Sequence, residues 1–190
     1  MKRTILVMFL LSTVSMAFSQ AYEAKVEHQR KNHVAAVIEV PYPPDQVEDA
    51  IKEYMAKKGF KSNASKGVQT FKGVKLYAAN ASNNDIHFIV ERKSRKEKES
   101  SLIHLVVSKE GETLAQRIPE DIAGLEDGKS FLNEMMPSLE AFNLEVEIGE
   151  QDKTVKKAEK KLENLSEDQQ DLEKKIRNLQ EKLEQNKKNQ

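Results

Sequence analysis

Apolar and polar residues alternate along two short segments in the middle of the chain. In residues 85–92, and again in residues 102–109, every second position is Ile, Phe, Leu or Val. A period of two is that of a strand with one buried face, and the charged residues between the segments suit a hairpin tip. We therefore predict an antiparallel sheet with one face on the core and the other in water. Further strands are predicted at residues 34–40, 60–62 and 68–77, and residues 22–33 form either an edge strand or a leader.

A helix is predicted over residues 45–58. Pro44 suits the first turn of a helix, and Gly59 suits the position just after its end. Between them, apolar residues recur three and four positions apart, which places them on one face. This apolar face consists of Val47, Ala50, Ile51, Tyr54 and Met55.

A second helical segment begins near Lys129 and keeps the same spacing as far as Phe142. Pro137 interrupts it and is expected either to kink the helix or to restart it. Residues 144–148 also alternate, so a short strand stays open as an alternative there. Together these segments predict an α+β fold, in which a small antiparallel sheet of four to five strands is covered by two helices on one face.

The most regular pattern is a heptad repeat in the last third of the chain. Apolar residues recur every seventh position in two series that are three residues apart, as in the seam of a coiled coil. Residues 144–190 are therefore predicted to form a charged coiled-coil helix that extends the fold. Its predicted partner-binding residues are Val155, Ala158, Leu162, Leu165, Gln169, Leu172, Ile176, Leu179 and Leu183.

The charges beside this seam bear on the choice of partner. In a parallel, in-register dimer, Asp168 would face Glu173 and Lys182 would face Lys187, and both are pairs of like charge. An antiparallel pair, a different protein partner or a single solvated helix fits these charges better.

Residues 1–19 have the features of a cleavable export signal. Lys2 and Arg3 precede a short apolar run over residues 5–11, and small residues, Ala17 and Ser19, occupy the positions that a signal peptidase reads. The expected organisation is a signal peptide over 1–19, an α+β globular domain over 20–143 and the helical extension over 144–190. We expect a periplasmic or secreted protein, with a bacterial envelope as the preferred compartment.

Charge, hydropathy and cysteine content exclude several classes of partner and chemistry. The 190 residues include 31 basic and 31 acidic side chains, so loss of Lys2 and Arg3 would leave a net charge of −2. A nearly neutral chain of mixed charges predicts no nucleic-acid partner. No segment after the signal is apolar enough to predict a transmembrane span. Cysteine is absent, which excludes disulfides and thiolate chemistry.

Candidate chemistry is sparse. A hairpin tip centred between Arg95 and Lys96 would place His87 directly opposite His104, where two imidazoles could share a metal or repel each other once protonated. No third ligand has a suitable spacing, so we predict no metal site and treat the two as half-exposed sheet histidines. No nucleophile and base have the spacing of a catalytic pair. The sequence therefore predicts neither an enzyme nor a bound cofactor.

The order of elements resembles a known arrangement. A strand, the turn Pro41-Tyr-Pro-Pro44, an amphipathic helix, several antiparallel strands and a long closing helix are similar to the helix-grip arrangement of small lipid-carrier domains. They are also similar to smaller sheet-plus-two-helix domains of unknown role. The first resemblance implies an alternative function, a carrier of a small apolar ligand. Our main expectation is an exported envelope protein of assembly type, which binds a protein partner or itself through the heptad helix.

Overall fold

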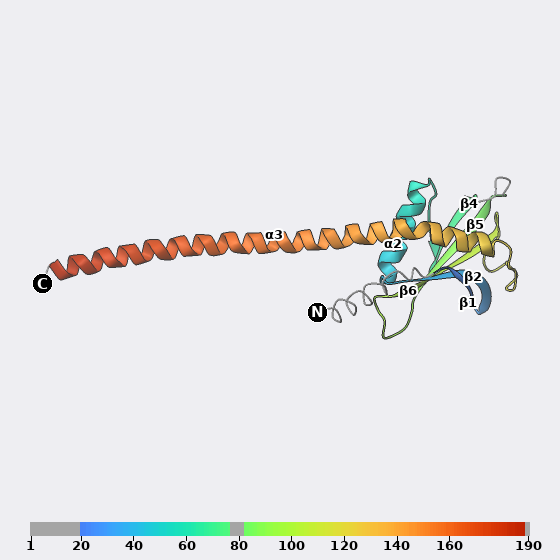
Figure 1. Ribbon diagram of the computed structural model, residues 1–190, viewed down its shortest axis with the longest axis horizontal. Helices are drawn as coiled ribbons and strands as arrows, with labels where there is room; N and C mark the ends of the chain where they lie inside the picture. Colours follow the sequence, from blue (N-terminus) through green and yellow to red (C-terminus); the bar gives the residue numbers. More distant parts are fainter. Residues whose placement is uncertain (1–19, 77–81, 189–190) are drawn as a thin grey trace, which may run out of the picture. The chain divides into compact units, whose positions relative to one another are not determined.

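The computed structural model describes residues 20–76 and 82–188 (Figure 1). The predicted signal, residues 1–19, lies outside the described residues. The described chain is an α+β fold, and its six-stranded antiparallel sheet has the order β1-β2-β6-β5-β4-β3. In chain order the elements are β1 (Tyr22–His28), β2 (Lys31–Val40), α2 (Pro44–Lys57), β3 (Asn63–Ser65), β4 (Val68–Val74), β5 (Asn84–Arg92), β6 (Ser101–Lys109) and α3 (Leu125–Lys188).

Two of the sheet predictions need correction. The sheet has six strands, not four to five, because residues 22–28 form an edge strand and pair with β2. Residues 60–62 are not a strand. The amide of Phe60 donates to the carbonyl of Met55 and closes the end of α2, so pairing with β4 starts only at Asn63.

The main core lies between the sheet and the two helices, as the sequence predicted. Ile51 and Met55 of α2 and Leu132 and Met135 of α3 are completely buried, and they belong to one cluster with the inward side chains of the sheet. The rings of Phe88 in β5 and Phe131 in α3 lie 6.4 Å apart. The same helical periodicity that placed these residues on one face therefore covers one side of the sheet.

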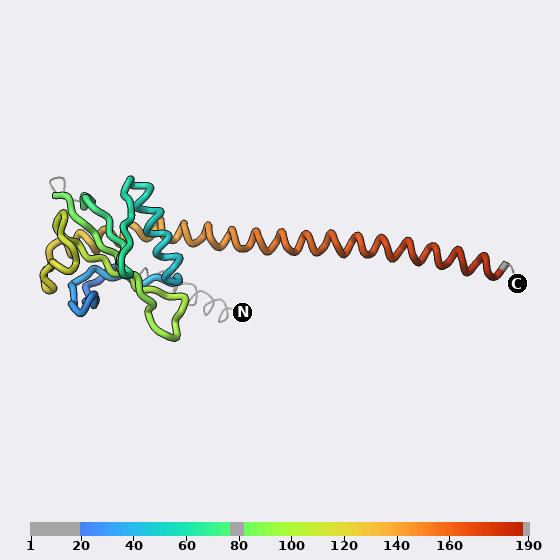
Figure 2. The backbone as a smooth tube through the Cα atoms, turned by 180° about the vertical axis from the view of Figure 1, so that it is seen from behind, coloured from blue at the N-terminus to red at the C-terminus, as the bar shows by residue number. Residues whose placement is uncertain are grey.

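The opposite face of the sheet is not the wet face that alternation predicted. It carries a second buried cluster, made of Val26, Ala35, Val37, Val68, Ile89, Val106 and Leu114. Leu114 belongs to the connector, residues 110–124, which runs beside the β1–β2 hairpin (Figure 2). The connector is tied there by the amide of Val34, which donates to the carbonyl of Pro119, and by Lys31 Nζ, which donates to the carbonyl of Ala115.

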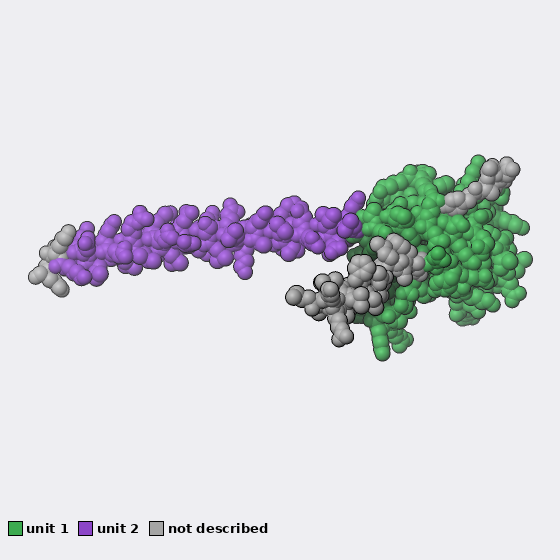
Figure 3. Space-filling view, viewed as in Figure 1, with its two compact units in different colours: residues 1–143 green, residues 144–190 purple. Residues whose placement is uncertain are grey.

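The helix α3 runs without interruption from Leu125 to Lys188, with Pro137 and Gly149 inside it. The alternative strand at residues 144–148 does not form. By contacts the chain divides into two compact units, one ending at Asn143 and one starting at Leu144 (Figure 3). Within the described residues, no helix combines the length and the apolar character that a membrane span needs.

Candidate functional site

The predicted seam residues form an exposed apolar surface on α3. Every described side chain from Glu150 to Lys187 is exposed, and Leu162 keeps 69% of its surface in water and Leu172 58%. We call this surface the heptad stripe. It consists of Val155, Ala158, Leu162, Leu165, Gln169, Leu172, Ile176, Leu179 and Leu183.

The structure extends the heptad stripe by one further repeat that sequence reasoning missed. Leu144 and Ile148 are helical and exposed, and they continue the two series toward the N-terminus of the helix. The heptad count itself was the signal that could have found them, because Ile148 precedes Val155 by seven residues. The competing strand alternation of residues 144–148 obscured it.

Polar side chains elsewhere on this helix pair with each other one turn apart. Lys156 Nζ lies 2.9 Å from Asp152 Oδ2, and Gln169 Nε2 donates to Glu173 Oε1 at 2.9 Å. Exposed pairs of this kind add only a few tenths of a kcal/mol to a helix. They support the helix, whereas the large apolar side chains of the heptad stripe are each more than half exposed.

The two candidate histidines lie on one face of the sheet but not opposite each other. In the observed register His87 faces Val106 and His104 faces Ile89, because the hairpin tip is centred one residue later than predicted, between Lys96 and Glu97. Both side chains are buried, not half-exposed. Among the described residues, no three His, Asp or Glu side chains gather as a metal site.

His87 belongs to a chain of hydrogen bonds. Its Nδ1 lies 3.0 Å from Thr70 Oγ1, and its Nε2 lies 2.8 Å from Ser108 Oγ. Ser108 Oγ in turn donates to a carbonyl, that of Glu112 at 3.0 Å or that of Asp85 at 3.2 Å. Because the hydroxyl proton of Ser108 is donated to a carbonyl, Ser108 Oγ accepts a hydrogen bond from Nε2–H of His87. Nδ1 of His87 then accepts a hydrogen bond from the hydroxyl of Thr70. Both ring nitrogens are therefore occupied in the neutral form.

Burial changes the charge state of these histidines. Desolvation lowers the pKa of His87 to about 4, against a smaller raising effect of Asp85. The pKa values of His104 and His33 are also lowered, again mainly by desolvation. Neither ring has a hydrogen-bond partner among the described residues, although His104 Nε2 lies 3.8 Å from Glu91 Oε2. At neutral pH all three imidazoles are uncharged.

Asp85 is a buried carboxylate that sequence reasoning passed over. Its Oδ1 accepts from the amide of Gly73 and its Oδ2 accepts from the amide of Gly111, each at 3.0 Å. Gly73 has a positive φ and lies where the register of β4 shifts against β5. Asp85 thus ties this irregularity of β4 to the start of the connector, and both of its oxygens are used in doing so.

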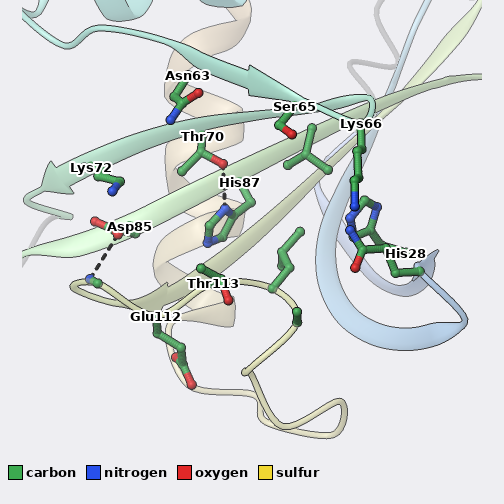
Figure 4. A pocket seen from close by; sticks show the side chains of 15 residues that line it. His28, Asn63, Ser65, Lys66, Thr70, Lys72, Asp85, His87, Glu112 and Thr113 are labelled. Carbon is green, nitrogen blue, oxygen red and sulfur yellow. Dashed lines mark hydrogen bonds between the residues drawn. The ribbon is translucent and has the colours of Figure 1, made fainter.

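A cavity of about 260 Å³ with a mixed lining lies beside these residues (Figure 4). The cavity is lined by Thr70 and Lys72 of β4, His87 of β5, residues 111–115 of the connector and Lys66 of the β3–β4 turn. Both ring nitrogens of His87 and both carboxylate oxygens of Asp85 have hydrogen-bond partners there. These hydrogen bonds hold the side chains of this part of the cavity lining in place.

Arg117 is the buried charge that holds the connector. Its Nη2 donates to the carbonyls of Asp121 and Ala123 at 2.9 and 3.1 Å, and its Nη1 lies 3.5 Å from Asp121 Oδ2. Only 3% of the residue is exposed. An arginine in an acidic loop gave no sequence signal that it would be buried, because its two hydrogen bonds go to backbone carbonyls.

No protein-family model, curated protein or solved structure matches this chain in the comparisons made. The function has to be argued from the heptad stripe and from the residues of the sheet.

Proposed function

We propose that this chain is an exported assembly protein of the cell envelope, in which the heptad stripe binds a protein partner or another copy of the chain and the α+β head positions it. The heptad stripe carries the proposal. Seven large apolar side chains of the heptad stripe, spaced three to seven residues apart, are each more than half exposed. Burying a Leu or Ile contributes about 1.5–3 kcal/mol, so a continuous row of them favours association.

The stability of the exposed part of α3 also favours a partner for the heptad stripe. A long charged helix without tertiary contacts gains little from its sequence propensity, and most helical stability in proteins comes from packing one apolar face. No described side chain of the helix beyond Asn143 is buried. A partner helix would supply it and would use the a and d positions of the repeat.

Association is tested by light scattering after gel filtration on the full chain and on a stripe variant that carries Leu162→Gln, Leu172→Gln and Leu179→Gln. The matched control changes three outward positions of the same helix, Glu163→Gln, Lys174→Gln and Glu181→Gln. We expect the wild type and the control to form the same complex, alone or with an added envelope extract, and the stripe variant to lose it. Equal behaviour of all three proteins would refute the proposal.

Export is tested separately, by placing residues 1–19 before a reporter enzyme that is active only outside the cytoplasm. We expect activity with the intact segment and none when Leu6, Leu10 and Leu11 are replaced by Asp, because the apolar run is the part that the export machinery reads. A reporter that stays inactive behind the intact segment would remove the envelope from the proposal.

The alternative, a carrier of a small apolar ligand between sheet and helices, has less support. Phe71, Phe88 and Phe131 fill this layer with ring centroids 5.9 and 6.4 Å apart, and each residue is at most 4% exposed. The cavity described above lies instead on the other face of the sheet and has charged and hydroxyl side chains in its wall. Extraction of lipid from the purified protein is the measurement that would favour the carrier.

A further inference from the structure

The charges beside the heptad stripe distinguish between ways of pairing two copies of α3. In a parallel, in-register pair each residue before an a position faces the residue five places later in the other helix. That rule brings together Glu147 with Asp152, Asp168 with Glu173, and Lys182 with Lys187. All three are pairs of like charge, and the other facing pairs have one uncharged member. A parallel dimer therefore has repulsion at its edges and no compensating attraction.

In an antiparallel pair, each a residue packs against a d residue of the second copy, and each such pair forms one layer of the seam. The same residues give five different layers. Leu162 packs on Leu179 of the second copy, and Leu165 packs on Ile176. The single polar residue in the middle, Gln169, packs beside Leu172. The complete set of layers is Val155 with Asn186, Ala158 with Leu183, Leu162 with Leu179, Leu165 with Ile176, and Gln169 with Leu172. Each layer occurs twice, because the pair has a two-fold axis.

The flanking charges agree better with this arrangement. Asp168 faces Lys175 of the second copy, an attraction that occurs twice. Lys187 faces Asp152 of the second copy on the other edge, a second attraction that occurs twice. Lys161 and Lys182 are the one unfavourable pair. Antiparallel pairing thus converts most of the repulsion of the parallel dimer into attraction.

Charges and seam layers together select the register. Sliding the two helices by one heptad toward their N-termini would bring Asp168 against its own copy and Lys161 against Lys175. Sliding them by one heptad the other way would bring Lys175 against its own copy and leave Val155 without a layer. The first shift adds pairs of like charge, which cost stability. The second shift keeps the same balance of charges, because Asp168 then faces Lys182 and Glu159 faces Lys187, and it is disfavoured by the loss of the Val155 layer.

We infer that the partner of the heptad stripe is a second copy of this chain, paired antiparallel so that Leu162 of one copy packs on Leu179 of the other. This inference rests on the proposed function, since it names the partner for the same surface. In the pair the two globular domains lie at opposite ends of the coiled coil.

The orientation is tested with two single-cysteine variants of the full chain, Leu162→Cys and Leu179→Cys, because the protein has no cysteine of its own. Each variant is oxidised alone in a glutathione buffer, and then the two are mixed and oxidised together. In the antiparallel pair, residue 162 lies about 25 Å along the axis from residue 162 of the second copy, which is far beyond the reach of a disulfide. We expect a covalent dimer only from the mixture.

Either other result overturns the inference. Dimers from each variant alone would indicate a parallel pair, and no dimer in any tube would indicate that the chain does not pair with itself in this register. The proposed function would survive the second result if the stripe variant described above still lost a complex with another envelope protein. It would fail only if the stripe variant and the wild type behaved alike.

A charge reversal tests the register without a cysteine. Lys161→Glu places a carboxylate against Lys182 of the second copy at two symmetric sites. The dissociation constant of the dimer should therefore fall about threefold to tenfold at low salt and less at high salt. Lys160→Glu, which makes the same charge change on the outer face, is the matched control. Adding Lys182→Glu to Lys161→Glu should return the affinity toward that of the wild type. No gain from Lys161→Glu over the control contradicts the antiparallel register.

Discussion

Three histidines are buried on the sheet face that turns away from the helices. His33 faces Val26, His87 faces Val106 and His104 faces Ile89, so all of them share the face of the second apolar cluster. Only His87 has hydrogen-bond partners at its ring nitrogens among the described residues. Protonation of any of them would place a charge in a desolvated layer under the connector, which links the stability of this face to pH.

The first prediction follows from His87. Folding lowers its pKa from 6.5 to about 4, so between these pH values the unfolded chain binds a proton that the folded chain does not. Its contribution to the free energy of unfolding is complete above pH 6.5 and falls by about 3 kcal/mol as the pH approaches 4. Urea unfolding at pH 7, 5.5 and 4.5 measures this loss. The variant His87→Gln should be less stable at pH 7 but should lose less over the same range; an unchanged pH slope would assign the acid sensitivity to other groups.

The second prediction concerns Asp85. An asparagine at this position has one acceptor oxygen, so the Asp85→Asn variant leaves one of the two glycine amides facing an NH₂ group. Loss of charge-assisted bonds to buried donors should cost about 2–3 kcal/mol of the free energy of unfolding. Asp49→Asn, at a carboxylate whose side chain is 64% exposed, is the control and should change it by less than about 0.5 kcal/mol. Equal effects in urea unfolding would argue against the structural role of Asp85.

At the scale of elements, α3 combines two kinds of surface in one helix. Its first turns bury Phe131, Leu132 and Met135 against the sheet, while its later turns carry the heptad stripe in water. The helix starts next to Gly124, which has a positive φ and lies so close to β6 that a Cβ atom there would be 2.6 Å from Val107 Cγ1. Glycine is therefore required at this position for two reasons: the positive φ and the lack of room for a Cβ atom.

The third prediction compares two glycines of this region. Gly124→Ala should lower the free energy of unfolding by more than about 1 kcal/mol, because the Cβ clashes with a β-branched side chain and φ is unfavourable. Gly149→Ala, in the exposed part of α3 with no atom within 4 Å of the added Cβ, should instead raise helix stability by about 0.5–1 kcal/mol. Thermal unfolding followed by circular dichroism measures both changes. The same sign for both would contradict the placement of Gly124.

At the scale of the whole molecule, the two compact units have different sources of stability. The buried clusters consist of residues no later than Leu139, and no described residue after Asn143 is buried. The first unit therefore has a core of its own, and the second has only the heptad stripe to bury. We expect the second unit to contribute to association and not to the fold of the first.

The fourth prediction is made at this scale. A chain that ends at Asp152 should keep the urea midpoint of the first unit within the error of the measurement, because it loses no core residue. It should also lose the association seen by light scattering, since it lacks the whole heptad stripe. A truncated chain that unfolds at much lower urea would show that the first unit depends on the extension.

The sequence alone determined the elements whose information is local. Alternation over residues 85–92 and 102–109 predicted β5 and β6, helical spacing with Pro44 and Gly59 predicted α2, and both helices cover the face that their periodicity indicated. The heptads predicted a helix with an apolar stripe, and such a helix is observed, although its binding role stays a prediction. These patterns succeed because the period of the backbone decides which side chains share a face.

Only the tertiary structure decided the rest. Alternation marks which side chains of a strand share a face, but whether the second face meets water depends on the connector, which reaches it through Leu114 and is tied to β2 by Val34. A hairpin tip shifted by one residue moved His104 from opposite His87 to opposite Ile89. The hydrogen bonds of Asp85 and Arg117 go to backbone groups that are distant in sequence or lie in an irregular loop, and the residue pattern does not show where such groups lie. Local periodicity thus fixes faces, whereas contacts between distant segments fix burial, register and charge state.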